Sequence, residues 1–127
     1  MMMKDEQVQY LANIYHLLLA DAEVGRVEEK AFELIAREIG AGYFERRNAL
    51  KSAEQATFQV RPVGRLSDRM RNLEDMLLAA YCNGVVDAAE KKLIVEFATQ
   101  VAVNKHQFSV MKSEAKRRHD EFGNSVN

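Results

Sequence analysis

The chain has 127 residues, of which 47% are hydrophobic and 29% charged, and its formal net charge is −1. This length fits one globular domain with a buried core, and the near-neutral charge argues against binding to nucleic acid. The only cysteine, Cys82, excludes a disulfide within the chain. The start of the sequence lacks the apolar core of a signal peptide, and no apolar run approaches the roughly 20 residues that span a bilayer. We therefore expect a cytoplasmic protein with no direct membrane insertion.

Three helices are predicted in the first half of the chain. Residues about 4–22 carry apolar side chains at helical spacing, namely Val8, Leu11, Ile14, Tyr15, Leu18 and Ala22. After a turn at Gly25, a second helix runs to about residue 39, where Gly40 and Gly42 can end it. Residues about 42–55 predict a third helix with a thin apolar face that includes Tyr43 and Leu50.

A connector and three more helices follow. Residues 56–66 contain Pro62 and Gly64, which disfavour helix, and no second strand candidate exists to pair with this segment. The next helix begins at Ser67 or Asp68 and ends at about residue 83. Asp87 and Asn104 are suitable N-caps for the last two helices. On the last helix, about 105–122, four apolar residues line one side: Phe108, Met111, Ala115 and Phe122.

Residues 17–35 resemble residues 76–94 when 59 is added to each number. The identical pairs include Asn13 with Asn72, Leu18 with Leu77, and Gly25 with Gly84. A duplicated helix–turn–helix unit indicates that neither half buries its apolar face alone. We predict one all-α domain over residues 1–127, a bundle of about six helices made of two pseudo-twofold-related repeats. The repeats cover about 8–54 and 67–122, and the connector about 55–66.

The two turns of this repeat are rich in side-chain oxygen. Carboxylates and amide oxygens around a glycine turn are the ligands that Ca²⁺ or Mg²⁺ prefers. The spacing excludes an EF-hand, because a loop that starts at Asp21 places Gly25 at position 5 and Phe32 at position 12. The alternative is purely structural, since acidic residues in a first turn cap a helix and favour its dipole. Asp87 and Glu90 have the spacing of a capping box.

The turns also resemble those of the TerB-like family, all-helical domains associated with tellurite resistance and found in DnaJ-type co-chaperones. The family pattern is an apolar helix end, Ala-x-Ala-Asp-Gly, a Val or Ile, acidic residues and a Leu-rich helix. Residues 78–90, LAAYCNGVVDAAE, carry it well, and residues 19–29, LADAEVGRVEE, more loosely. The resemblance covers about residues 8–120.

This resemblance implies a module of stress-response or metal-resistance assemblies that works with a protein partner and is not an enzyme. It also implies a divalent cation, Ca²⁺ or Mg²⁺, held by residues of the two turns: Asp21, Glu23, Asn83, Asp87 and Glu90. At the spacing of 59, the acidic positions differ between the copies, since Asp21 matches Ala80 and Glu90 matches Ala31. We therefore expect two unequal sites. The alternative function is a metal-free helical scaffold for protein–protein interaction.

The remaining polar residues show no pattern typical of a zinc site or of a reactive cysteine. His16, His106 and His119 lack the spacing of zinc ligands, and Cys82 lacks a neighbouring base in the sequence. A basic group around the connector could bind an anion or an acidic partner, although a solvated face is the commoner meaning of such a group. It consists of Arg61, Arg65, Arg69 and Arg71. An exposed apolar stripe on the third or last helix would indicate a homodimer.

Overall fold

The computed structural model describes residues 2–20, 24–82 and 86–126, the last four of them by backbone only. The described residues form six α-helices and no strand, which confirms the all-α prediction. Their bounds are α1 Lys4–Leu19, α2 Arg26–Glu38, α3 Tyr43–Ala53, α4 Leu66–Tyr81, α5 Ala88–Val101 and α6 Lys105–Val126. None of these helices is both long enough and apolar enough to cross a membrane.

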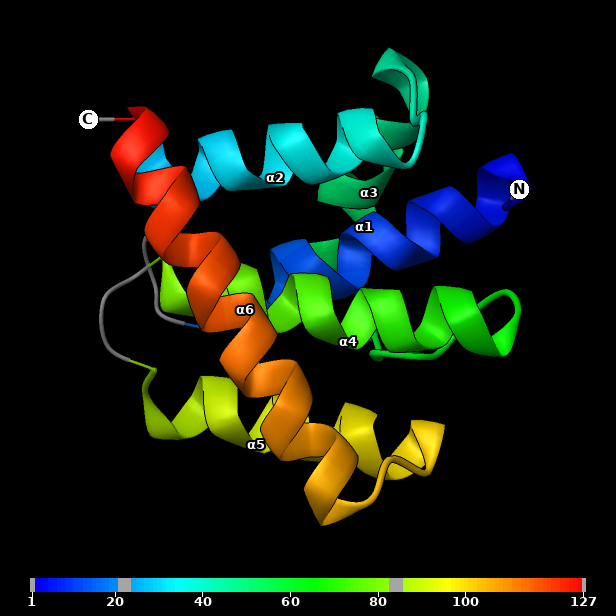
Figure 1. Ribbon diagram of the computed structural model, residues 1–127. Helices are drawn as coiled ribbons and strands as arrows, with labels where there is room; N and C mark the ends of the chain where they lie inside the picture. The colour runs from blue at the N-terminus through cyan, green and yellow to red at the C-terminus, as the bar shows by residue number, and fades with distance from the viewer. Residues whose placement is uncertain (1, 21–23, 83–85, 127) are drawn as a thin grey trace.

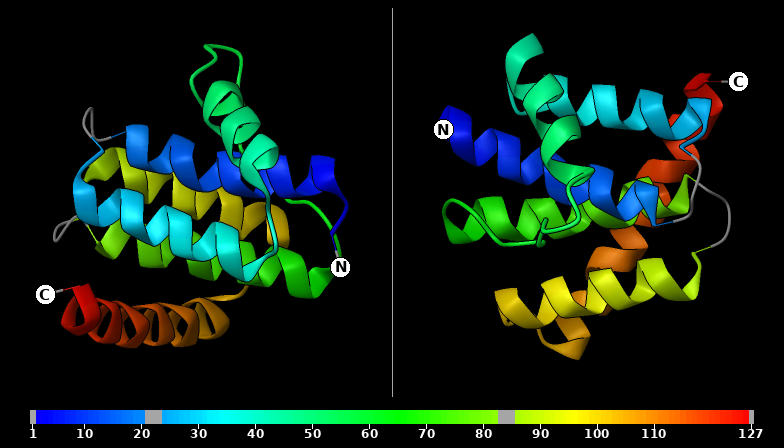
Figure 2. Two further views of the ribbon diagram at one scale, coloured as in Figure 1. Left: turned by 90° about the horizontal axis from the view of Figure 1, so that it is seen from above. Right: turned by 180° about the vertical axis from the view of Figure 1, so that it is seen from behind.

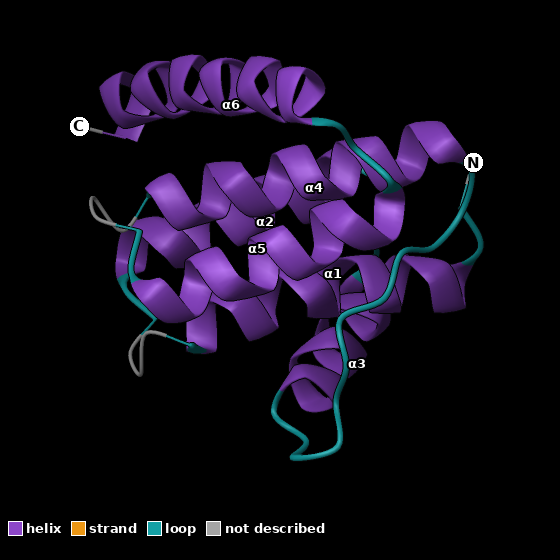
Figure 3. Ribbon diagram, turned by 90° about the horizontal axis from the view of Figure 1, so that it is seen from below, coloured by secondary structure: helices purple, strands orange, loops and turns teal. Residues whose placement is uncertain are grey.

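Two helices occupy the centre of the bundle. α1 and α4 lie side by side and run in the same direction, and α2 and α5 run back along them (Figure 1). α3 packs on α1 and α6 packs on α4, so these two helices cover opposite faces of the central four (Figures 2 and 3). The pattern of packing is unchanged when α1, α2 and α3 are exchanged for α4, α5 and α6.

The core lies between α1 and α4 and extends under the four outer helices. Leu11, Ile14 and Leu18 of α1 are fully buried, as their helical spacing predicts, and Leu73 and Met76 of α4 face them from the same core cluster. Tyr10 and Leu17 are also fully buried. α1 therefore buries more than one stripe, because α2, α3, α4 and α5 all pack around it.

Each helix begins in the same way. The backbone N–H of the N-cap residue donates to the side chain of the third helical residue, which satisfies one of the donors that a helix start leaves without an intrahelical partner. These third residues are Glu6, Glu28, Glu45, Asp68, Glu90 and Gln107. The N-cap of α4 is Arg65, so the predicted caps Ser67 and Asp68 lie inside that helix.

The helix starts recur at a spacing of 62 residues, not 59. α1 and α4 begin at 4 and 66, α2 and α5 at 26 and 88, and α3 and α6 at 43 and 105. The left-handed residues after α2 and α5, Gly40 and Ala102, follow the same spacing. The helix starts are therefore offset by three residues from the sequence alignment. A shift of three residues is close to one helical turn, so the apolar residues still fall on nearly the same face.

The buried face of α3 also differs from the expectation. Ala49 and Ala53 are its buried residues, whereas Tyr43 is exposed and Leu50 only partly buried. On α6, 62 residues later, the buried pair is Met111 and Ala115. The two alanines lie in the packed part of α3, whereas Tyr43 and Phe44 at its start are exposed.

Candidate functional site

The helix ends that flank the two predicted turns lie at one end of the bundle. There α1 and α4 end and α2 and α5 begin (Figures 1 and 3), and we call this the paired-turn end. Asp21, Glu23 and Asn83, three of the five predicted metal ligands, lie outside the described residues. The other two, Asp87 and Glu90, are at the start of α5. The structure therefore places the helix ends that flank the two turns at the same end of the bundle.

Asp87 and Glu90 form the capping box that their spacing predicts. The backbone N–H of Glu90 donates to Asp87 Oδ1 at 2.8 Å, and the N–H of Asp87 donates to Glu90 Oε1 at 3.3 Å. These bonds stabilise the start of α5 without a metal ion. The predicted structural role of the pair is thus confirmed.

Burial distinguishes two of the six capping residues from the rest. Glu90 is fully buried and Glu28 is 4% exposed, whereas the capping side chains of the other four helices are partly or largely exposed. Glu28 Oε1 accepts from the N–H of Gly25 at 3.0 Å. Because 28 + 62 = 90, the two glutamates hold equivalent positions. At this spacing Glu90 matches Glu28, whereas at the spacing of 59 it matches Ala31, and Glu28 is not among the predicted ligands.

Cys82 lies at the paired-turn end, where its thiol senses the charge of a residue from the first half of the chain. It is the C-cap residue of α4, and burial raises the pKa of its thiol to about 11, with a further contribution from the charge of Glu28 on α2. Such a thiol is protonated at neutral pH and is a poor nucleophile. The sequence predicts a small buried side chain at a helix end, and the structure places Cys82 at the end of α4 with its side chain partly buried.

The described side chains do not by themselves complete a metal site. Among them, no group of three or more His, Cys, Asp or Glu residues lies close enough together to hold an ion. The chemistry of the donors nevertheless suits a hard cation, since Glu28, Asp87 and Glu90 all offer carboxylate oxygens. A complete site would need oxygens from Asp21, Glu23 or Asn83 as well.

The basic group of the connector does not form one free cationic surface. Arg61 Nη2 donates to Gln9 Oε1 at 3.2 Å, and Arg69 Nε donates to the Gly64 carbonyl at 3.2 Å. Arg71 Nε lies 3.9 Å from Asp75 Oδ2, and Arg65 is the N-cap of α4. The guanidinium groups of Arg61, Arg69 and Arg71 contact different parts of the chain, and anion binding there stays a prediction.

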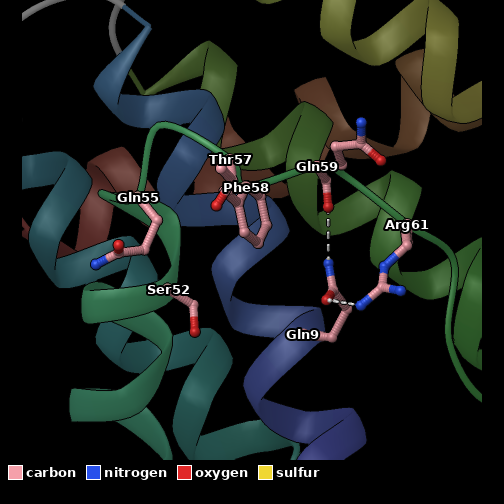
Figure 4. Close-up of a pocket in the computed structure, with 7 residues that line it drawn as sticks. All are labelled: Gln9, Ser52, Gln55, Thr57, Phe58, Gln59 and Arg61. Atoms are coloured by element: carbon pink, nitrogen blue, oxygen red, sulfur yellow. Dashed lines mark hydrogen bonds between the residues drawn. The ribbon is translucent and has the colours of Figure 1, made fainter.

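An open pocket of about 390 Å³ lies between α1, the end of α3 and the connector (Figure 4). Amide and hydroxyl side chains line it, together with the Phe58 ring and the Arg61 guanidinium. Gln9 joins its walls, because Gln9 Nε2 donates to the Gln59 carbonyl at 3.2 Å while its Oε1 accepts from Arg61. None of the lining residues forms a nucleophile–base pair. The lining set is Gln9, Ser52, Gln55, Thr57, Phe58, Gln59 and Arg61.

The histidines have separate surroundings. His16 Nδ1 lies 3.2 Å from the Ala53 carbonyl, and its ring packs on Phe58 with centroids 4.9 Å apart. His119 Nδ1 lies 3.7 Å from Asp120 Oδ1 on the same helix.

Comparison of the chain with protein-family models, with curated proteins and with solved structures finds no match.

Proposed function

We propose that this chain is a non-catalytic, TerB-like module that binds a divalent cation at its paired-turn end. One observation carries the proposal: Glu28 and Glu90 occupy equivalent positions, 62 residues apart, and are the two buried members of the six capping residues. The resemblance of the turns to TerB-like domains supports the same function. The spacing of 62, which the helix starts and the capping residues share, supports a duplicated unit of three helices.

The two buried carboxylates at one end of the bundle are of the type that binds a hard cation. Carboxylate oxygens are ligands that Ca²⁺ and Mg²⁺ prefer. Each glutamate places one oxygen on an N-cap N–H, at 3.0 Å for Glu28 and 3.3 Å for Glu90. Asp21, Glu23, Asn83 and Asp87 belong to the same two turns in sequence, and their oxygens would supply the further ligands that Ca²⁺ or Mg²⁺ requires.

Because capping alone also accounts for these glutamates, the test must separate capping from metal binding. Calorimetric titration with Ca²⁺, Mg²⁺, Mn²⁺ and Zn²⁺ is expected to give heat with at least one ion, and the melting temperature should rise with that ion. Glu28→Gln and Glu90→Gln should weaken binding at least tenfold. Glu45→Gln is the matched control, since Glu45 caps α3 in the same way but is not buried. No heat and no melting shift with any of the four ions would reject the cation.

A metal-free interaction scaffold is the second candidate, and a different observation favours it. Tyr43 and Phe44 at the start of α3 are 67% and 71% exposed, and their rings form an edge-to-face pair with centroids 5.6 Å apart. Exposed aromatic residues are enriched among the energetic centres of protein interfaces. This candidate predicts that a specific protein partner, or a second copy of the chain, binds in the presence of chelator. Binding should be lost in the Tyr43→Ser, Phe44→Ser double variant.

A further inference from the structure

An apolar groove lies on the face of the bundle where α6 crosses α4 and α5. Leu77 of α4, Ile94 and Val95 of α5 and Phe108 of α6 line it, and its volume is about 330 Å³. Val95 is 55% exposed there, although a valine side chain gains about 1.5–3 kcal/mol when it is fully buried. The groove is therefore an apolar surface within the size range of small-ligand pockets.

The charge on the groove has one sign. Its lining includes two cationic residues, Lys91 of α5 and Lys112 of α6, and no acidic residue. The Lys112 ammonium lies 5.1 Å from the centroid of the Phe108 ring, so its charge is held at the edge of the apolar surface. A ligand that complements this lining has an apolar body and a negative charge.

The dimensions favour a small molecule over a partner helix. The lining residues of α5 lie between Lys91 and Val95 and those of α6 between Phe108 and Lys112, which is about 6 Å along each helix at 1.5 Å per residue. A partner helix with its side chains is about 10–12 Å across, which exceeds the width that these residues offer. We propose that the groove binds a small amphiphilic monoanion, in which an alkyl or aryl body carries a single carboxylate.

Decanoate is a suitable probe, with decanol as the uncharged ligand of equal chain length. Each ligand is titrated below its micelle concentration, and binding is followed by the amide chemical shifts of the protein. Decanoate should shift the amides of the groove residues, and decanol should bind at least tenfold more weakly. Lys112→Gln should weaken decanoate at least fivefold, whereas Lys116→Gln on the exposed face of α6 should not. Equal affinity for decanoate and decanol, or equal effects of the two lysine variants, would overturn the proposal.

Variants of two exposed valines serve as controls for loss of folding and for non-specific binding of decanoate. Val95 and Val110 are 55% and 56% exposed, and only Val95 is among the groove residues. Val95→Asp should abolish decanoate binding, and Val110→Asp should leave it unchanged, with both variants retaining their helical circular dichroism. If an acidic amphipathic peptide binds in a Val95-dependent way and decanoate does not, the groove is a peptide-docking site and the small-molecule proposal is wrong. Neither result depends on the cation.

Discussion

Tyr10 and Asp75 meet in the centre of the bundle, where the Tyr10 hydroxyl on α1 donates to Asp75 Oδ2 on α4 at 2.5 Å. Both side chains are fully buried. The residues related to this pair by the spacing of 62 are Asn72 (10 + 62) and Asn13 (75 − 62), and they also bond to each other between the same helices. Asn13 Nδ2 donates to Asn72 Oδ1 at 2.9 Å, and Asn72 Nδ2 donates to the Tyr10 carbonyl at 3.2 Å. Buried polar contacts thus join α1 and α4 at both pairs.

The Asn13–Asn72 contact should contribute measurably to stability. Asn72→Leu leaves the Asn13 amide without one of its buried partners, and an unsatisfied buried group costs about 1–3 kcal/mol. In urea denaturation, Asn72→Leu and Asn13→Leu should each lower the free energy of unfolding. The double variant should lose less than the sum by about 0.5–3 kcal/mol, as for residues in contact. If the loss in the double variant equals the sum of the two single losses, the predicted interaction between Asn13 and Asn72 is wrong.

Asp75 predicts a dependence of stability on pH. Burial raises the pKa of the Asp75 carboxyl above its usual value, and the hydrogen bond from Tyr10 and the charge of Arg118 oppose this shift. The folded state therefore binds more protons than the unfolded state between the unfolded pKa, about 3.9, and the raised folded pKa. Stability should fall as pH rises through that window. Asp75→Asn should remove this part of the pH dependence in denaturation curves recorded from pH 4 to 8.

Arg118 of α6 forms an ion pair with the same carboxyl group, that of Asp75 on α4. Its Nη1 lies 3.0 Å from Asp75 Oδ1 and 3.1 Å from Glu74 Oε1. Arg118→Met leaves the Asp75 charge buried without this partner, so we expect a loss of about 3–5 kcal/mol in the free energy of unfolding at neutral pH. The variant should also lose stability more steeply as pH rises. Arg117→Met is the control, because Arg117 pairs with exposed glutamates of its own helix, and ion pairs in solvent contribute little to stability.

The Cys82 thiol should react slowly. With a pKa of about 11, the thiolate fraction at pH 7 is only about one in ten thousand, and the alkylation rate should rise about tenfold per pH unit until that pKa. Glu28→Gln removes a negative charge that raises the pKa, so its rate at pH 8 should be higher than that of the wild type. Glu29→Gln, an exposed neighbour, should have no such effect. Rapid alkylation of the wild type at pH 7 would contradict the buried setting.

Substitutions at the residues that follow α2 and α5 should reveal the cost of their left-handed backbone conformation. Gly40 and Ala102 have φ values of 78° and 64°, a conformation that costs a residue with a Cβ atom about 1 kcal/mol or more. Gly40→Ala should lower the free energy of unfolding by about 1 kcal/mol, and Ala102→Gly should raise it by a similar amount. Ala89→Gly within α5 serves as the control, because glycine inside a helix destabilises it. Thermal or urea unfolding measures all three.

Much of the fold follows from local pattern. Helical periodicity and the positions of Pro62 and the glycines predict six helices and their connector, and the capping residues Asp87 and Asn104 are confirmed. These features depend on contacts within one or two helical turns. The register of the repeat did not follow, because Leu- and Ala-rich helix ends match nearly as well one turn out of step. Of the candidate site, the sequence predicted the capping pair Asp87–Glu90 but not the equivalence of Glu28 and Glu90.

The sequence by itself determined the helices, their order and the oxygen-rich turns, since helix formation and capping depend on neighbouring residues. Only the tertiary structure decided which polar groups are buried and which surfaces stay open. Tyr10, Asp75 and Glu28 carry no local signal of burial, and they are buried because helices distant in sequence pack over them. The groove beside Val95 likewise exists because α6 crosses α5 at an angle (Figure 1). Burial and grooves come from the packing of whole helices, which no short stretch of sequence contains.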